Sequence, residues 1–207
     1  MSSLLTIAMP KGRLLERVSS LLEQADIPTP FPLEDERQLI VEFGGFRYAV
    51  IRPFDLPTYV EYGAADLGFV GKDVLLETQA KVYEPLDLQI GRCRLVIAGK
   101  EGMDPFRGAT RVVTKYPKLT QQIFSRHGVS VEIIKLHGSV ELAPLVGLAD
   151  RVVDLVESGA TLERQQLIIL ADIAPISTRL IVNRVSYKMK HEPINSLLRR
   201  IEKAIQQ

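Results

Sequence analysis

The stretch that decides the fold runs from Val152 to Glu163 and has the sequence VVDLVESGATLE. Its first half is apolar and rich in β-branched Val around one acid, Asp154, a pattern that favours a β-strand. The small residues Ser158 to Thr161 follow, and then a helix-forming segment from Leu162 to Gln166. The stretch therefore predicts a strand, a tight loop and the start of a helix.

The small residues of this loop allow a ligand to lie directly against the backbone N–H groups. Those groups and the positive end of the following helix together form an anion site. Asp154 is unsuited to holding a phosphate but suited to accepting hydrogen bonds from sugar hydroxyls. An acid beside an anion site indicates a sugar phosphate as ligand. The alternative is an ordinary strand-to-helix turn in which Ser158 or Thr161 caps the helix.

The composition limits the classes of protein that the chain can represent. With 207 residues, 46% hydrophobic and 25% charged, it can bury a core in one large domain or two small lobes. A net charge of +1 gives no broad basic surface for nucleic acid. Neither an export signal nor a run long enough to span a bilayer is recognisable, so we expect a cytoplasmic protein without membrane contact.

The residues that usually carry covalent or metal chemistry are few. The single cysteine, Cys93, excludes a disulfide framework and is expected to be a buried structural thiol in a reducing compartment. The three histidines are scattered, with no metal-ligand spacing and no Ser-His-Asp pattern. We therefore predict no protein metal site and expect catalysis by positioning and charge.

Basic residues occupy the first predicted strand-to-helix loop. A strand is expected at 4–8 and a helix at 14–24, which places Lys11, Gly12 and Arg13 between them. Cations at a helix N-terminus oppose the helix dipole, and a bound phosphate would offset that cost. The alternative is a solvated basic turn.

A second cation follows a predicted hairpin. Strands are expected at 38–43 and 47–51, joined by Gly44 and Gly45, a strong hairpin pattern. Arg52 then lies at the carboxyl end of a strand, where open α/β sheets bind ligands. Asp55 is expected to cap a helix that runs to about Tyr62.

The rest of the chain alternates between predicted strands and helices. Further strands are expected at 67–70, 82–88, 92–99, 111–114, 131–135, 151–156, 167–176 and 177–183, and further helices at 72–77, 117–127, 141–147 and 193–207. This alternation predicts a parallel α/β architecture. The pattern starts again near Gly91, which predicts lobe I at 1–91 plus 178–207 and lobe II at 92–177.

Four stretches carry a resemblance to a known family: MPKGRL at 9–14, RPFDLP at 52–57, GAADLGFVGKD at 63–73, and the long run from Gly138 to Leu162. Together they resemble ATP phosphoribosyltransferase, the first enzyme of histidine biosynthesis, over essentially the whole chain. The loop also partly resembles that of adenine- and orotate-type phosphoribosyltransferases, where two acids precede it. Here Val153 stands in place of the first acid, which favours the histidine-pathway family.

The resemblance implies a two-lobed, periplasmic-binding-protein-like fold of type II, with the active site in the cleft between the lobes. It implies that N1 of the ATP adenine attacks C1 of 5-phosphoribosyl 1-diphosphate (PRPP) and releases diphosphate, with Mg²⁺ bound by the substrate. The chain resembles the short form of the family. That form works as dimers within a hetero-octamer with a regulatory subunit resembling histidyl-tRNA synthetase.

The resemblance also implies the site residues. Arg52 and Lys11 would act on the leaving diphosphate and neighbouring phosphates as the catalytic residues. PRPP would be bound by Asp154, Glu157, Ser158, Gly159, Ala160 and Thr161. ATP would be bound by Lys11, Gly12, Arg13, Asp66, Leu67, Asp73 and Glu141, of which Asp73 and Glu141 could instead be supporting or helix-start acids. The alternatives are an anion- or solute-binding protein of the same fold and an adenine-type phosphoribosyltransferase.

Overall fold

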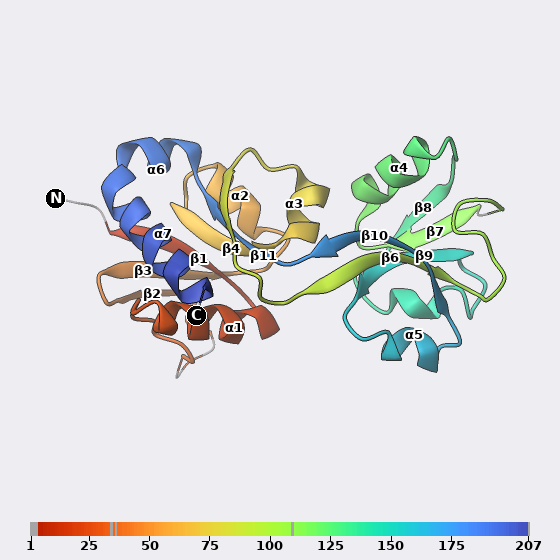
Figure 1. Cartoon of the computed structure of the whole chain (residues 1–207), viewed down its shortest axis with the longest axis horizontal. Coiled ribbons are helices and arrows are strands. Elements are labelled where there is room, and N and C mark those ends of the chain that lie inside the picture. The colour runs from red at the N-terminus through yellow and green to blue at the C-terminus, as the bar shows by residue number, and fades with distance from the viewer. Residues whose placement is uncertain (1–3, 34, 36, 109, 207) are drawn as a thin grey trace. The chain divides into compact units, whose positions relative to one another are not determined.

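The computed structural model describes residues 4–33, 35, 37–108 and 110–206, and it divides the chain into two compact units (Figure 1). Unit 1 comprises Met1–Gly91 and Ser177–Gln207, and unit 2 comprises Arg92–Ile176. The sequence prediction placed the second boundary one residue later. Ser177 belongs to unit 1, where its hydroxyl donates to the carboxylate of Asp87 at 2.7 Å.

Unit 1 is built on one mixed six-stranded sheet of order β2-β3-β1-β4-β11-β5. Its strands are β1 (Leu5–Pro10), β2 (Ile40–Phe43), β3 (Phe46–Ile51), β4 (Leu67–Gly71), β5 (Tyr83–Asp87) and β11 (Thr178–Val182). Its helices are α1 (Arg13–Gln24), α2 (Leu56–Glu61), α3 (Lys72–Thr78), α6 (Arg184–Met189) and α7 (His191–Ile205). Strand β1 is parallel to both β3 and β4, whereas β2, β11 and β5 pair antiparallel with their neighbours.

Local sequence explains the hairpin of unit 1. Gly44 and Gly45 have φ angles of 57° and 84°, the left-handed backbone that a tight two-residue hairpin turn requires. Because glycine has no β-carbon, it adopts this conformation without strain. The predicted hairpin of β2 and β3 is thereby confirmed.

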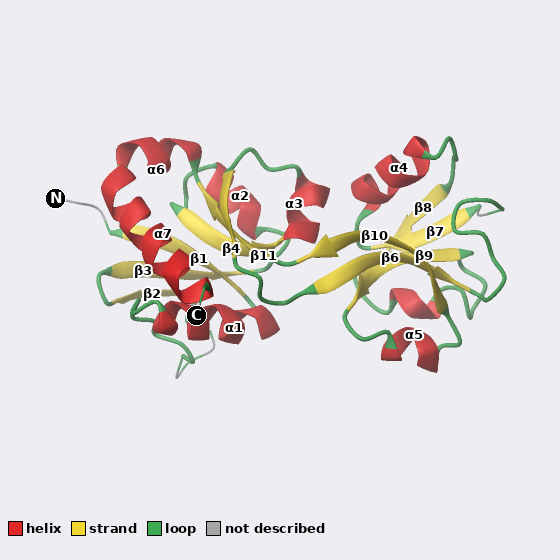
Figure 2. Cartoon of the chain, viewed as in Figure 1, coloured by secondary structure: helices red, strands yellow, loops and turns green. Residues whose placement is uncertain are grey.

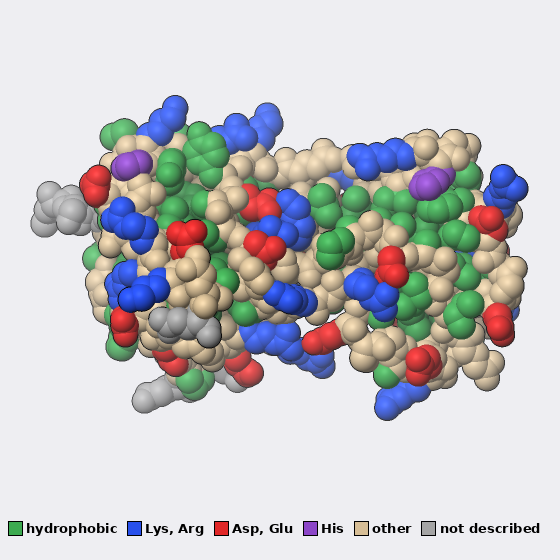
Figure 3. Space-filling view, in the orientation of Figure 1, with side chains coloured by type: hydrophobic (Ala, Val, Ile, Leu, Met, Phe, Trp, Pro, Cys, Tyr) green, Lys and Arg blue, Asp and Glu red, His purple; other side chains and the backbone are tan. Residues whose placement is uncertain are grey.

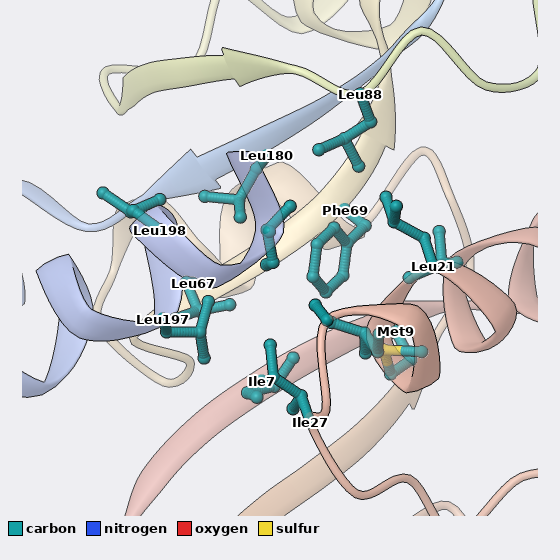
Figure 4. Close-up of a cluster of buried hydrophobic side chains, with 14 of the residues drawn as sticks. Ile7, Met9, Leu21, Ile27, Leu67, Phe69, Leu88, Leu180, Leu197 and Leu198 are labelled. Atoms are coloured by element: carbon teal, nitrogen blue, oxygen red, sulfur yellow. The ribbon is translucent and has the colours of Figure 1, made fainter. Parts of the chain in front are cut away.

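Helices cover both faces of the unit 1 sheet. On one face, Ile7, Met9 and Phe69 of the sheet pack with α1 and α7, as Figure 4 shows. On the other face, Ala8, Val70 and Ile181 pack with α2 and α3 through a second cluster that includes Leu56, Val60, Val74 and Leu75. Neighbouring strand residues serve opposite faces because side chains alternate along a strand.

A buried ion pair joins the first strand of unit 1 to its last helices. The carboxylate of Asp66 accepts hydrogen bonds from the Thr6 N–H at 2.8 Å, the Ser186 hydroxyl at 2.6 Å and the Lys190 ammonium at 2.8 and 2.9 Å. Asn183 caps α6 by accepting from the N–H groups of Val185 and Ser186. Helix α6 was not predicted from the sequence, although this Asn is a favoured N-cap residue.

Unit 2 contains a mixed five-stranded sheet of order β10-β6-β9-β7-β8. Its elements are β6 (Cys93–Gly99), β7 (Arg111–Thr114), α4 (Pro117–Arg126), β8 (Glu132–Lys135), the 3₁₀ turn η1 (Val140–Leu142), β9 (Arg151–Val156), α5 (Ala160–Arg164) and β10 (Ile168–Ile176). Strand β7 is parallel to β8 and β9, and β6 is antiparallel to β9 and β10. Helices α4 and α5 lie on opposite faces of this sheet (Figure 2).

Three sequence predictions are corrected by the structure. Both sheets are mixed and not parallel, because β2, β5, β6, β10 and β11 run antiparallel to their neighbours. The helix predicted at 141–147 is only the short turn η1, since Pro144 lacks an N–H and Gly147 has a φ of 72°. Cys93, the first residue of β6, is half-buried and not fully buried.

The remaining elements agree with prediction to within one or two residues at most ends. The terminal helix begins two residues before its predicted start, and its predicted last residue, Gln207, lies outside the described residues. No helix in the described part of the chain is long and apolar enough to cross a membrane. Basic and acidic side chains are mixed on the visible surface of each unit (Figure 3), in keeping with the small net charge.

Candidate functional site

Two predicted cationic residues lie together at one edge of the unit 1 sheet. Pro10, the last residue of β1, pairs in parallel register with Ile51, the last residue of β3. Lys11 and Arg52 follow these paired positions, and the Lys11 N–H donates to the Ile51 carbonyl at 2.8 Å. Both residues are exposed. The fold thus brings two positive charges from separate loops to the carboxyl edge of neighbouring strands, the usual ligand edge of α/β sheets.

Gly12 shapes the loop that carries Lys11. Its φ and ψ are 96° and −157°, a combination that residues with a β-carbon rarely adopt. No heavy atom of the described residues lies within 4 Å of the position that a β-carbon would occupy there. Helix α1 begins at the next residue, Arg13, which is exposed. This arrangement leaves open space beside the backbone at the N-terminus of a twelve-residue helix.

A cavity of about 570 Å³ extends from this loop along the flank of α1. Its lining is mainly apolar and includes Leu15, Phe31, Leu33 and Val50. Lys11 and Gly12 belong to the lining, as do the acids Glu16 and Glu23 on α1. Among the described residues that line the cavity, Lys11 carries the positive charge, and its end is the one suited to an anion.

Arg52 is followed by a turn that starts α2. Its carbonyl accepts from the N–H groups of Asp55 at 3.0 Å and Leu56 at 3.1 Å. Pro57 lies in the first turn of the helix, where a missing N–H costs nothing. The predicted capping role of Asp55 is wrong, because within the described residues its side chain makes no hydrogen bond that caps α2.

Three residues that were predicted to contact ATP have buried side chains. Asp66 is 5% exposed, and its carboxylate is held by Lys190, Ser186 and Thr6 as described above. Leu67 is 0% exposed within the core of unit 1. Asp73 is buried in the first turn of α3, as expected of a helix-start acid. Their burial favours structural roles for these side chains in unit 1, and their contact with ATP stays a prediction.

In unit 2, Asp154 lies on β9 between two neighbouring strands, with Val96 of β6 as its registered partner. Its side chain is 19% exposed. Alternation along β9 puts Asp154 on the same face as Val152 and Val156, whose side chains pack with Leu162 of α5. Asp154 therefore lies on the face of the sheet that carries the small-residue loop.

The loop itself follows β9 directly. Glu157, Ser158, Ala160 and Thr161 are exposed, and Gly159 has a φ of 87°. The Ala160 N–H donates weakly to the Ser158 hydroxyl at 3.4 Å. Helix α5 begins at Ala160, two residues earlier than predicted, so Thr161 belongs to its first turn, where backbone N–H groups have no partner inside the helix. Glu141, also predicted as a ligand residue, is half-buried in η1.

Sequence reasoning missed one charged neighbour of this loop. Lys115 directly follows β7, and its ammonium lies 3.8 Å from the carboxylate of Asp154. The pattern that identified Arg52, a cation at the carboxyl end of a predicted strand, applies equally to Lys115. Among the described residues, no group of three or more His, Cys, Asp or Glu is arranged to hold a metal ion.

Comparison with known proteins identifies the family. A family model described as HisG, ATP phosphoribosyltransferase, matches residues 52–203. The chain is 49% identical to the ATP phosphoribosyltransferase of Geobacter metallireducens, over 99% of this chain and 100% of that protein. The chain belongs to the ATP phosphoribosyltransferase family. It is also 46% identical to the Bacillus subtilis member, over 100% of this chain and 98% of that protein.

Solved structures agree on the fold. The ATP phosphoribosyltransferase HisG:HisZ complex from Thermotoga maritima contains a chain with 40% identity and a TM-score of 0.87, with 98% of both chains covered. The aliphatic sulphonate-binding protein SsuA from Escherichia coli has 16% identity and a TM-score of 0.59, over 97% of this chain and 72% of that one. This second likeness shows the fold alone, and the predicted periplasmic-binding-protein-like fold is confirmed.

Proposed function

We propose that the chain transfers the phosphoribosyl group of PRPP to N1 of the adenine of ATP, the first step of histidine biosynthesis. The C1–O bond to diphosphate breaks, diphosphate departs with the electron pair, and the lone pair of N1 forms the new bond to C1. The observation that carries the proposal is the placement of Asp154 on the face that leads into the loop at 158–161, within a chain of this family. An acid beside an anion loop suits a ribose bearing a 5′-phosphate.

PRPP is assigned to unit 2. The 5′-phosphate lies against Ser158, Gly159, Ala160 and Thr161, which offer backbone N–H groups and two hydroxyls. Asp154 accepts hydrogen bonds from the ribose hydroxyls. Glu157 directly follows β9 and completes the predicted set, acting on the ribose and not on the phosphate because its own charge repels an anion.

The leaving diphosphate and the phosphates of ATP are assigned to the cationic edge of unit 1. Arg52 holds the diphosphate, since a planar guanidinium can make paired contacts with phosphate oxygens. Lys11, Gly12 and Arg13 hold phosphates at the start of α1. The Lys11 end of the neighbouring cavity suits phosphate, and its apolar lining suits a purine. Glu141, in η1, is assigned to ATP, and its alternative role is to support the loop at 158–161.

This reaction requires positioning and charge and no covalent nucleophile. Orienting two bound reactants can supply roughly 7–11 kcal/mol of the barrier, and one donor aimed at developing charge about 3 kcal/mol more. The oxocarbenium-like transition state places negative charge on the departing diphosphate, where Arg52 acts. Mg²⁺ accompanies the diphosphate, bound mainly by substrate oxygens and water, as this ion commonly is in phosphate chemistry.

We also propose a partner. The Thermotoga maritima relative was solved as a HisG:HisZ complex. By analogy, short-form dimers of this chain join a subunit resembling histidyl-tRNA synthetase in a hetero-octamer, which supplies activation and histidine feedback. We place the reaction in the cytoplasm, where ATP and PRPP are available.

An assay of purified chain tests the function. Diphosphate release is measured with PRPP and ATP, with PRPP and free adenine, and with PRPP alone, in each case with and without the synthetase-like subunit. The proposal expects release only when ATP is present. Release with free adenine instead of ATP would identify an adenine-type enzyme. PRPP binding without any diphosphate release would identify a binding protein, the non-enzymatic alternative.

Thr161→Val tests the loop. The substitution removes one hydroxyl and leaves the shape of the side chain nearly unchanged. It should raise the KM for PRPP and leave the KM for ATP unaltered. Gly159 is a poorer target, because its φ of 87° strains any residue that carries a β-carbon. Thr58→Val, at an exposed position on α2, is the matched control. Equal KM values for PRPP in the Thr161 variant and the control would remove the loop from the PRPP site.

A further inference from the structure

The loop after β7 is locked against the strand that carries Asp154. Thr114, the last residue of β7, pairs in parallel register with Val153 of β9. Its side chain is fully buried, and its hydroxyl donates to the Val153 carbonyl at 2.8 Å. The same hydroxyl accepts from the N–H of Tyr116 at 2.9 Å. One buried side chain therefore fixes the backbone on both sides of Lys115.

The register and one ion pair together place Lys115. Asp154 follows Val153 on β9, so its side chain lies on the opposite face from the Thr114–Val153 pair, and Lys115, which directly follows β7, reaches it there. Their side chains meet there, with 3.8 Å between the ammonium nitrogen and a carboxylate oxygen. On this face Val113 of β7 packs in the same cluster as Leu162 of α5, the helix that the loop at 158–161 leads into.

The solvent exposure of the Lys115–Asp154 pair favours a role in positioning over a role in folding stability. The side chains of Lys115 and Asp154 are 31% and 19% exposed, so water screens their attraction and the pair adds little to folding stability. The hydrogen bonds of Thr114 hold the backbone around Lys115 in place, and a contribution to folding stability from so weak an ion pair does not explain this arrangement. It is well explained by a need to hold the Asp154 carboxylate in one orientation.

We propose that Lys115 is a positioning residue of the PRPP site, acting through Asp154. Its ammonium holds the carboxylate in the orientation from which both oxygens can accept hydrogen bonds from the ribose hydroxyls. The inference rests on the proposed function, because it takes PRPP as the ligand of this face. Thr114 supports the same arrangement, since its hydroxyl holds the backbone on both sides of Lys115.

The test compares Lys115→Met and Lys115→Arg in the chain assembled with its partner subunit. Lys115→Met should raise the KM for PRPP about tenfold, the size of coupling expected between neighbouring charged groups, with the KM for ATP and the melting temperature unchanged. Lys115→Arg keeps the charge and should recover most of the affinity. Thr114→Val removes the locking hydroxyl and should raise the same KM by a smaller factor.

The double variant distinguishes action through Asp154 from an independent contact. In an Asp154→Asn background, Lys115→Met should change the KM for PRPP by less than about twofold, because the interaction that it removes is already lost. A full tenfold effect in that background would overturn the proposal, as would an unchanged KM in the single variant. Lys135→Met is the matched control: Lys135 ends the neighbouring strand β8, opposite Thr114 in register, and is exposed.

Direct binding separates this inference from the proposed function. Titration calorimetry of the wild-type protein and the variants with PRPP needs no turnover. If the wild type binds PRPP without releasing diphosphate in the presence of ATP, the proposed function fails while the role of Lys115 is still measured. If the wild type turns over and Lys115→Met binds PRPP as tightly as the wild type does, the inference fails alone.

Discussion

Replacing Asp66 with alanine should destabilise unit 1 more than any single surface change. The carboxylate joins two segments that are distant from it in sequence: β1, through the Thr6 N–H, and the region of α6, through the Ser186 hydroxyl and the Lys190 ammonium. Its side chain is 6% exposed and that of Lys190 is 28% exposed. Alanine removes every acceptor at once and leaves these donors facing an apolar side chain.

The expected magnitude follows from those partners. Removing one member of a buried ion pair typically costs about 3–5 kcal/mol. The lower end applies here, since Lys190 is partly exposed and its ammonium can turn towards water. The Thr6 N–H has no such freedom and contributes about 1–3 kcal/mol of the loss as an unpaired donor. We therefore expect about 3 kcal/mol, which for a chain of this size lowers the melting temperature by roughly 6–12 °C.

Urea unfolding followed by circular dichroism measures the loss, with Glu42→Ala as control. Glu42 also forms an ion pair in unit 1, with Arg47 at 2.6 Å, but the two side chains are 55% and 49% exposed. Such a pair is worth less than about 1 kcal/mol. If Asp66→Ala is no less stable than Glu42→Ala, the reasoning about the buried network is refuted.

Three further predictions concern the site and its frame. Arg52→Ala should lower kcat about 10²–10³-fold at saturating PRPP and ATP, because it removes the positive charge that stabilises the departing diphosphate. Near-wild-type turnover would show that Arg52 does not act on the leaving group. Gly12→Ala should cost about 1–3 kcal/mol in urea unfolding from its φ of 96° alone, as no clash opposes it; an unchanged midpoint would contradict this. Hydrogen bonds from the Thr110 hydroxyl and the N–H groups of Arg111 and Thr110 lower the pKa of Asp150 to about 2. Because the folded pKa is below the unfolded value, this stabilisation is present above about pH 4 and lost as pH falls towards 2. In Asp150→Asn, the free energy of unfolding should therefore fall less steeply between about pH 4 and pH 2 than in the wild type. An equally steep fall in the variant would contradict this prediction.

Features that depend on neighbouring residues could be predicted from the sequence. Gly44 and Gly45 determine a turn by their own backbone freedom. Arg52 and the loop at 158–161 were recognisable because each follows an apolar strand. Their side-chain roles remain proposals, but their positions at the ends of β3 and β9 agree with prediction.

Features that depend on distant partners could not be predicted. Asp66 lies in a stretch of small residues that resembles a ligand loop, and only Lys190, 124 positions later, makes it a buried structural acid. The segment after Ser139 has helix-forming residues, yet Pro144 and Gly147 end the turn, and Leu142, Leu145, Val146 and Leu148 stay exposed. A local pattern marks Lys115 as a cation after a strand, but its pairing with Asp154 depends on the packing of β7 against β9, which the local sequence does not encode.

The position of β11 in unit 1 has a consequence for how the protein is made. This strand lies between β4 and β5, and it reaches the sheet only after all of unit 2 has left the ribosome. At about 5–20 residues per second, the delay is on the order of ten seconds. During that interval β4 lacks one neighbour and β5 lacks its described partner strand. The nascent chain therefore carries an open strand edge in unit 1 until β11 is made, and such an edge can pair with other chains.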